Sequence, residues 1–211
     1  FEHDWQGVRS RDGNIFGRTT DHEQRYQEDI AIISSLAPNY RMSLMWSKLQ
    51  RNAYAPLDAE TVRYYHTLLQ GLRSNNVTVM MVLHHFANPM WFTSLGGWEN
   101  EENIVVWADY AKKVVDEFGD YIVFWNTFNE PNLYSSLGWI FGEFPPRKTN
   151  IITAYKVIKN VAKAHHQLYR YIKDKYPAAQ VSISHNCTVF RAHNFTGKLP
   201  AALFDWCFMD Y

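Results

Sequence analysis

One glutamate stands at the end of a strongly apolar segment, in the sequence VFWNTFNEPNLY of residues 123–134. Trp125 and Phe128 belong to the apolar part, whereas Asn129, Glu130 and Pro131 are poor strand formers. A carboxyl group placed among aromatic side chains loses solvation, which favours its protonated form. Such a group suits a general acid, so Glu130 is the first catalytic candidate. The alternative is a structural ion pair between Glu130 and an arginine.

The neighbours of Glu130 predict its local geometry. Proline restricts the residue before it to extended backbone, so we expect Glu130 to be extended and Pro131 to keep the chain from turning straight into a helix. Asn129 and Glu130 would point to opposite faces of a regular strand. If both serve one site, the strand must contain a β-bulge there, a common feature beside active sites.

Polar side chains also lie in or at the ends of three other apolar segments. Arg41 lies inside YRMSLMW, and a buried arginine needs a carboxylate partner, either structural or catalytic. His84 and His85 follow VTVMMVL, and no further ligand comes at metal-binding spacing. We therefore expect no metal and no cofactor, and favour a hydrogen bond from His85 to a polar substrate. His185 and Asn186 end the last segment with hydrogen-bonding groups.

These four apolar segments are predicted to be strands, at residues 39–46, 77–86, 121–129 and 179–186. Their nearly continuous apolar character is typical of strands covered on both faces. Apolar periodicity predicts a helix before each strand, at residues 21–37, 58–74, 102–119 and 150–176. Alternating helices and strands predict parallel strands joined by helical crossovers.

Within these helices the sequence predicts one cap and one buried face. Thr20 with Glu23 fits a capping box at the start of the first helix. In the last helix, the residues expected on one apolar face are Ile151, Tyr155, Ile158, Ala162, His165, Tyr169, Ile172 and Tyr176.

Two α/β architectures are compatible with this order of elements. A doubly wound sheet usually carries a glycine-rich turn after its first strand, and neither G-x-G-x-x-G nor a P-loop occurs in the sequence. A (β/α)8 barrel carries its chemistry in loops at the carboxyl ends of its strands, but a complete barrel takes about 250 residues. We therefore predict that residues 1–211 form one incomplete domain, with about four parallel strands of a (β/α)8 TIM barrel.

Composition excludes several classes of partner. Lys+Arg and Asp+Glu both number 21, so the formal net charge is 0, and in the absence of a basic run nucleic acid is not an expected partner. No apolar run reaches about 18 residues, so no membrane span is expected. Cys187 and Cys207 make no disulfide framework, and reduced thiols predict a cytoplasmic location. Because the sequence opens on Phe1 instead of methionine, we expect that an upstream part has been removed.

Six motifs in order resemble glycoside hydrolase family 1, the β-glucosidase and β-galactosidase family. They are DHEQRYQEDI (21–30), YRMSLMWSKL (40–49), LHHFANPMWF (83–92), GGW (96–98), TFNEP (127–131) and SISHN (182–186). The resemblance covers essentially the whole chain, which corresponds to the N-terminal half of the family's barrel. It implies retaining hydrolysis of a β-linked glycoside or oligosaccharide, with Glu130 as general acid/base. It also implies that Asn129 binds the sugar 2-hydroxyl, His85 binds another sugar hydroxyl, and Arg41 contacts the nucleophile carboxylate.

The sequence departs from the family pattern in ways that leave other functions open. The family's nucleophile motif, Thr/Ser-Glu-Asn-Gly, does not occur in the 211 residues, and the first and later barrel strands are absent. We therefore expect the chain alone to be inactive. The alternatives are a non-catalytic sugar-binding half-barrel and a half-barrel completed by a partner chain. Thioglucosidase relatives lack the acid, so Glu130 favours O-glycosides. The sequence does not decide among glucose, galactose, fucose and 6-phospho sugars.

Overall fold

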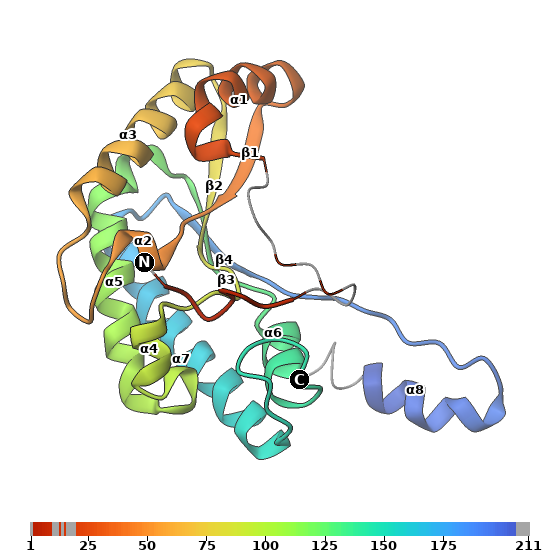
Figure 1. The fold of residues 1–211 in the computed structure, drawn as a ribbon. Coiled ribbons are helices and arrows are strands. Elements are labelled where there is room, and N and C mark those ends of the chain that lie inside the picture. Colours follow the sequence, from red (N-terminus) through yellow and green to blue (C-terminus); the bar gives the residue numbers. More distant parts are fainter. Residues whose placement is uncertain (1, 10–12, 14, 16–19, 206–211) are drawn as a thin grey trace.

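Four parallel strands form one sheet in the computed structural model, which describes residues 2–9, 13, 15 and 20–205 (Figure 1). The strands are β1 (Asn39–Ser43), β2 (Thr78–His84), β3 (Phe124–Asn129) and β4 (Gln180–Ser184), hydrogen-bonded in the order β1-β2-β3-β4. Each predicted strand is confirmed, with somewhat shorter bounds. Phe1 and Cys207 lie outside the described residues, and Cys187 is an exposed free cysteine.

One long helix precedes each strand, as predicted. These helices are α1 (His22–Leu36), α3 (Ala59–Ser74), α5 (Ile104–Phe118) and α7 (Ile151–Lys175). α1 contacts α3, α5 contacts α7, and α3 and α7 contact strands of the sheet, so the helices form a layer beside it (Figure 1). The shorter elements are α2 (Trp46–Leu49), α4 (Met90–Ser94), η1 (Gly97–Glu99), η2 (Glu101–Asn103), η3 (Gly119–Tyr121), α6 (Pro131–Trp139), η4 (Phe195–Gly197) and α8 (Lys198–Asp205).

The strand register brings the polar strand ends together. Ser43 of β1 pairs with Val82, and His84 of β2 pairs with Phe128. Asn129 of β3 pairs with Ser184 of β4. Because all four strands are parallel, their carboxyl ends meet at one edge of the sheet. We call this edge, with the residues that directly follow each strand, the rim.

An aromatic cluster forms the core beneath the rim. The rings of Trp107 and Phe128 stack with centroids 4.5 Å apart, and Trp98 meets Phe128 edge-on at 5.3 Å. All three side chains are at most 1% exposed. Aromatic pairs of this geometry add about 0.5–1.5 kcal/mol beyond their buried area. The cluster therefore gives the end of β3 a rigid support.

The buried face of α7 differs from the predicted one. Ile151 and Tyr155 are 69% and 55% exposed, whereas Ala154, Val157 and Ala164 are buried. The helix carries two apolar stripes. The stripe with the smaller side chains packs inward, since α7 lies directly against both α5 and α6.

The predicted capping box at the start of α1 is wrong. Asp21 is the N-cap, in a left-handed conformation with φ 57°, and no side chain caps the helix. The carboxylate of Glu23 instead forms an ion pair with Lys48 of α2. This contact ties α1 to the segment that follows β1.

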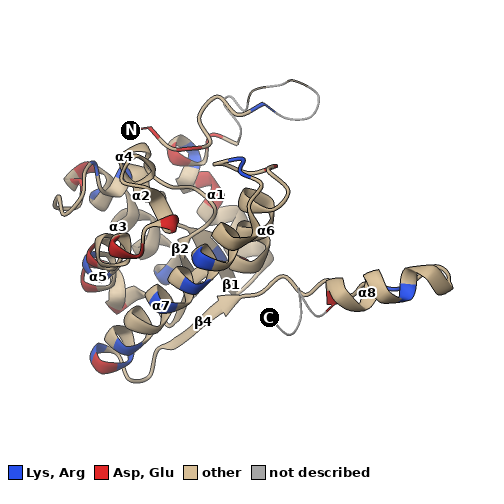
Figure 2. Cartoon of the chain, turned by 90° about the horizontal axis from the view of Figure 1, so that it is seen from below, with Lys and Arg blue, Asp and Glu red and all other residues tan. Residues whose placement is uncertain are grey.

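The charges on α7 and the apolar character of the helices relate to two partners considered above, nucleic acid and membranes. Lysines of α7 are opposed by carboxylates of neighbouring elements (Figure 2): Lys175 lies 2.6 Å from Asp116 of α5, and Lys163 pairs with Glu101. In addition, the described part of the chain contains no helix with the length and apolar character needed to cross a membrane.

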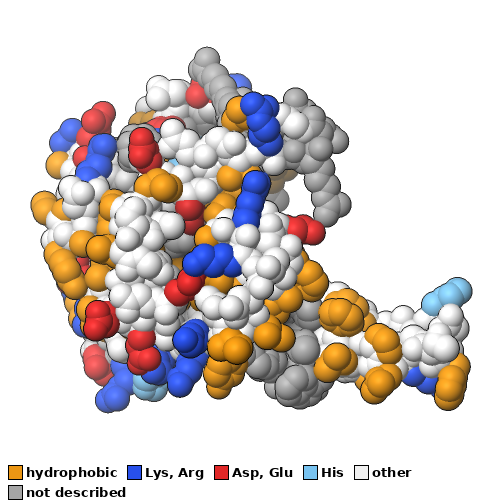
Figure 3. Space-filling model, turned by 60° about the horizontal axis from the view of Figure 1, so that its bottom comes forward, with side chains coloured by type: hydrophobic (Ala, Val, Ile, Leu, Met, Phe, Trp, Pro, Cys, Tyr) orange, Lys and Arg blue, Asp and Glu red, His pale blue; other side chains and the backbone are white. Residues whose placement is uncertain are grey.

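The last described helix, α8, projects away from the body of the molecule and carries apolar side chains (Figure 3). Phe195 of the preceding η4 and Leu199 and Leu203 of α8 recur every fourth residue and are 82%, 81% and 57% exposed. No residue of α8 is buried, and its aromatic contact joins Phe204 to Phe190.

Replacing Leu168 of α7 by alanine should lower the free energy of unfolding by about 2–5 kcal/mol, because the side chain is fully buried and its removal leaves a cavity. The adjacent Gln167→Ala is the matched control. Gln167 is exposed, so this variant should stay within about 0.5 kcal/mol of the parent. Urea denaturation of the three proteins measures both values. Equal stability of the two variants would contradict this assignment of the α7 face.

Candidate active site

The end of β3 contains the β-bulge that the sequence predicts. The pairing of β3 with β4 shifts register between Asn126 and Asn129. Beyond the shift, Asn129 is buried at 6% exposure and the backbone N–H of Glu130 donates to the carbonyl oxygen of Ser184 at 2.7 Å. The bulge thus changes the direction of β3 just before its two candidate residues.

The expected extended conformation of Glu130 is wrong. Its φ of 42° and ψ of 58° are left-handed, and α6 begins at Pro131. Proline disfavours the right-handed helical region for the residue before it, which the left-handed conformation avoids. Pro131 suits the first helical position because no N–H is needed there. A non-glycine residue in this conformation costs about 1–3 kcal/mol, a strain that typically occurs at functional sites.

Arg41 is not buried, contrary to the expectation from its apolar neighbours in the sequence. The residue is exposed, and its described partners are polar and uncharged. Arg41 Nη2 donates to Asn129 Oδ1 at 2.5 Å and to Ser184 Oγ at 3.5 Å. Within the described residues Arg41 forms no ion pair. The contact with Asn129 occupies the amide oxygen and leaves the amide N–H groups for another acceptor.

His85 lies at the rim, next to the end of β2. Its Nδ1 lies 2.7 Å from Ser43 Oγ, which orients the ring through one nitrogen. Partial burial and the positive charge of Arg41 lower the pKa of His85, while Glu130 opposes this shift. A neutral imidazole is therefore favoured, and it is electrostatically coupled to both candidate residues on the neighbouring strands.

His84 faces the core and takes no part in a site with His85. Its Nε2 lies 3.0 Å from Asn88 Oδ1, and Trp98 Nε1 donates to the same oxygen at 3.0 Å. Burial lowers the pKa of His84 to about 4, so the ring is neutral at physiological pH. Among the described residues no group of three or more His, Cys, Asp or Glu side chains could hold a metal ion.

Glu130 is contacted from the segment after β4. Asn186 Nδ2 donates to Glu130 Oε1 at 3.2 Å, so the structure brings together two polar strand ends that the sequence singled out. His185 is the other polar residue that ends this strand in the sequence, and its Nε2 lies 3.1 Å from Asn132 Nδ2. Sequence reasoning missed Asn132, Ser43 and Ser184, because a lone asparagine or serine near a strand end carries no recognisable signal.

The N-terminal segment is attached to the loop that follows β2. Asp4 Oδ1 and Oδ2 accept from the backbone N and Nδ2 of Asn88 at 2.9 and 2.7 Å, and Asn88 Nδ2 also donates to Tyr134 at 2.8 Å. Trp5 Nε1 donates to the carbonyl of Phe86 at 3.0 Å. Burial raises the pKa of Asp4 to about 6, although its hydrogen bonds with Asn88 oppose the shift. Nothing in the sequence around Asp4 indicates this role.

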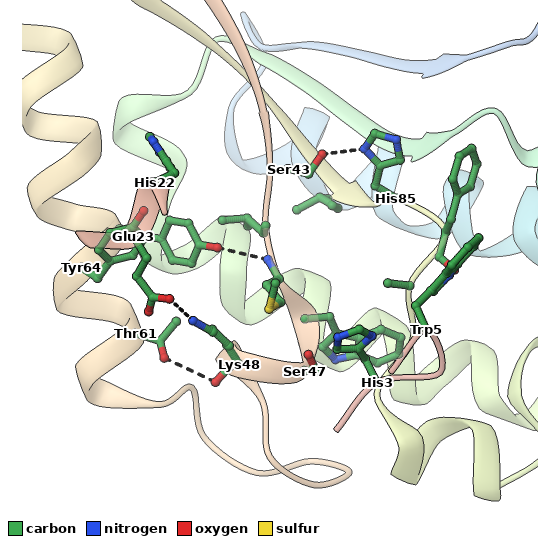
Figure 4. Close-up of a pocket in the computed structure, with 17 residues that line it drawn as sticks. His3, Trp5, His22, Glu23, Ser43, Ser47, Lys48, Thr61, Tyr64 and His85 are labelled. Atoms are coloured by element: carbon green, nitrogen blue, oxygen red, sulfur yellow. Dashed lines mark hydrogen bonds and ion pairs between the residues drawn. The ribbon is translucent and has the colours of Figure 1, made fainter. Parts of the chain in front are cut away.

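A hollow of about 620 Å³ opens beside His85 (Figure 4). Its lining combines aromatic and polar side chains, among them Trp5, Ser43, His85 and Phe86, with the Glu23–Lys48 pair at its other end. Asn129 and Glu130 do not line it. The hollow therefore adjoins the side of the rim formed by β1 and β2, away from the carboxylate.

The sequence model described as Glycosyl hydrolase family 1 matches residues 5–195. Lactase/phlorizin hydrolase from Homo sapiens is 35% identical over 146 residues, which are 68% of this chain and 8% of that protein. The 1,4-beta-D-glucan glucohydrolase of Thermotoga neapolitana is 25% identical over 214 residues, which are 98% of this chain and 50% of that protein.

Solved structures give the same result for the fold. A beta-glycosidase from Pyrococcus horikoshii superposes with a TM-score of 0.87 at 27% identity, covering 98% of this chain and 49% of that chain. A family 1 b-glucosidase from Thermotoga maritima gives 0.88 at 23% identity, with 97% and 46% covered. The chain spans about half the length of these structures. They are TIM-barrel enzymes, so the predicted fold class, part of a (β/α)8 barrel, is confirmed.

Asp4 should make stability depend on pH. The folded chain keeps a proton on Asp4 between about pH 4 and pH 6 that the unfolded chain releases, so the free energy of unfolding should fall as pH rises through this window. Asp4→Asn should remove that part of the pH dependence. It should also lower the free energy of unfolding by the same amount at every pH, because the new amide cannot accept from both Asn88 groups. Thermal denaturation between pH 4 and 7 tests this, with exposed Asp174→Asn as control. Parallel curves for the parent and Asp4→Asn would refute the assignment.

Proposed function

The chain belongs to glycosyl hydrolase family 1, and on this basis we propose that it carries the acid/base half of a retaining β-glycosidase that acts on O-glycosides. The observation that supports this most directly is the meeting of Arg41, Asn129 and Glu130, with His85 beside them, at the rim of three parallel strands. Core packing alone does not account for these polar groups at one edge.

Each of the four residues has a proposed role that its contacts allow. Glu130 protonates the leaving-group oxygen and then serves as base towards water. Asn129 donates its amide N–H to the sugar 2-hydroxyl, since its oxygen is engaged by Arg41. His85 binds another sugar hydroxyl through Nε2, because Nδ1 faces Ser43. Arg41 is exposed at the rim and can receive a nucleophile carboxylate.

Retention of configuration requires a second carboxylate about 5 Å from the first. The sequence contains no Thr/Ser-Glu-Asn-Gly motif, so we propose that the nucleophile comes from further polypeptide, either of the same protein or of a partner chain. The sheet supports this, because β1 and β4 each pair with only one other strand among the described residues. Unpaired strand edges favour the addition of further strands.

Relatives of the chain bear the names 6-phospho-beta-galactosidase and Coniferin beta-glucosidase, at 28% and 33% identity. These names refer to different sugars. The proposal therefore extends to β-linked O-glycosides as a class.

Glu130→Gln should separate good from poor leaving groups in the polypeptide encoded by the full reading frame. Without the acid, kcat/KM for an alkyl β-glycoside should fall by about 10²–10⁴-fold, whereas a dinitrophenyl β-glycoside, which needs little protonation, should retain most of its glycosylation rate. Glu60→Gln, an exposed carboxylate on α3, is the matched control and should leave both values unchanged. Equal losses on both substrates would rule out the acid role.

The proposed dependence on further polypeptide has its own test. Residues 1–211 expressed alone should not hydrolyse an aryl β-glucoside, whereas the product of the full reading frame, or the chain with its partner, should do so. The intact mass of the purified natural protein shows whether the further polypeptide belongs to the same chain or to a partner chain. Turnover by residues 1–211 alone would overturn the proposal that the nucleophile lies elsewhere.

A further inference from the structure

Among the described residues, Asn186 donates a hydrogen bond to the Glu130 carboxyl group. Its amide nitrogen Nδ2 donates to Glu130 Oε1 at 3.2 Å. The other end of the same amide is also fixed, because the hydroxyl of Thr188 donates to Asn186 Oδ1 at 2.6 Å. With Oδ1 held in this way, the N–H groups of the amide face Glu130.

Asn132 in turn holds the backbone of Asn186. Its Nδ2 donates to the carbonyl of Asn186 at 2.9 Å, and its Oδ1 accepts from the N–H of Asn186 at 3.2 Å. Asn132 is only 5% exposed and lies in the first turn of α6, the helix that begins directly after Glu130. One buried side chain therefore joins the helix that follows the acid to the segment that contacts the acid.

We propose that Asn132 and Asn186 are positioning residues for Glu130: Asn132 fixes Asn186, and Asn186 fixes one oxygen of the carboxyl group. This inference rests on the proposed function, and it deepens it. Neither asparagine touches substrate in this scheme. They act on the orientation of the acid alone.

The two carboxyl oxygens then have separate tasks. Oε1 accepts from Asn186, which leaves Oε2 to carry the proton. As the nucleophile carboxylate bonds to the anomeric carbon, the glycosidic bond breaks and its electron pair goes to the leaving-group oxygen. The proton on Oε2 transfers to that oxygen, so Glu130 becomes a carboxylate. The amide of Asn186 stays in contact with that charge until the second step, in which Glu130 takes a proton from water while the water oxygen bonds to the anomeric carbon and releases the nucleophile carboxylate. Hydrogen bonds to an ionised group are the stronger kind, so this contact strengthens as the proton leaves.

The backbone geometry at Glu130 explains why its carboxyl group needs a second residue to hold it in place. Glu130 has a left-handed backbone, and it lies between a bulged strand and a helix start. Small changes of backbone angle at such a turn move a long side chain by large distances. A misplacement of about 1 Å can cost on the order of 10²-fold in rate. The hydrogen bond from Asn186, in the segment after β4, holds the carboxyl group at its end and removes this freedom.

Leaving-group dependence in the polypeptide of the full reading frame tests the proposal. Asn186→Ala and Asn132→Ala should each lower kcat/KM for an alkyl β-glycoside by about 10- to 100-fold. The loss on a dinitrophenyl β-glycoside should stay within about 3-fold, because that substrate depends little on the acid. In a Glu130→Gln background neither substitution should have a further effect on the alkyl substrate, since all three act through one group.

Asn160→Ala is the matched structural control. Asn160 is a buried asparagine of α7 whose Nδ2 donates to the carbonyl of Trp98 at 2.9 Å, far along the chain from Glu130. Its loss should affect both substrates by the same factor. If the Asn132 and Asn186 variants behave like Asn160→Ala while Glu130→Gln keeps its selective loss, the positioning role is overturned and the acid role stands. If Glu130→Gln itself shows no selectivity, the proposed function fails instead.

A second measurement requires no activity. In ¹⁵N-labelled protein the side-chain amide resonances of Asn186 should depend on pH through the contact with the Glu130 carboxyl group. This dependence should disappear in Glu130→Gln and shrink in Asn132→Ala. Asn186 is only partly buried and its substitution leaves the Asn132 contacts to its backbone intact, so Asn186→Ala remains informative if Asn132→Ala fails to fold. An Asn186 resonance that responds equally in the parent and in Glu130→Gln would overturn the contact.

Discussion

The change of chain direction at the end of β3 determines which side chains can meet at the rim. In a regular strand Asn129 and Glu130 would point to opposite faces of the sheet. The register shift before Asn129, followed by the left-handed conformation of Glu130, lets the first residue contact β1 and the second contact the segment after β4. Two rim contacts depend on this turn. Arg41 has its partner because the Asn129 side chain reaches towards β1, and Asn186 has its partner because the Glu130 side chain reaches the segment after β4.

Among the described residues, the rim is held by hydrogen bonds between the ends of different strands and not by buried ion pairs. Arg41 donates to an amide, His85 contacts a hydroxyl, and Glu130 accepts from an amide. A carboxylate–arginine pair at Glu130 would favour the ionised form strongly and oppose proton donation. Uncharged hydrogen-bond partners orient these side chains with a smaller effect on whether they are protonated. The aromatic cluster under Phe128 supplies the rigidity that such short contacts need.

The sequence predicts the architecture well and the local geometry poorly, for identifiable reasons. Apolar runs and 3.6-residue periodicity locate every long helix and strand, because burial determines both patterns. The face of α7 is mispredicted, since periodicity cannot decide between a stripe of large residues and one of small residues when neighbouring helices pack closely. Pro131 suggested an extended Glu130, and the left-handed alternative left no trace in the residue types. Asn132 and Asp4 act through contacts with residues distant in the sequence, which no local pattern contains.

The apolar stripe that Phe195 of η4 forms with Leu199 and Leu203 of the projecting α8 has a thermodynamic consequence. A helix of this length is marginal in water on its own, because nucleation is unfavourable and few backbone bonds offset it. Most helical stability in proteins comes from packing an apolar face. Within the described residues the stripe of α8 has no such packing, so folding of this arm and covering of its stripe are coupled in one equilibrium. Whatever surface covers the stripe therefore acts as a ligand for the helix and raises its melting temperature by mass action.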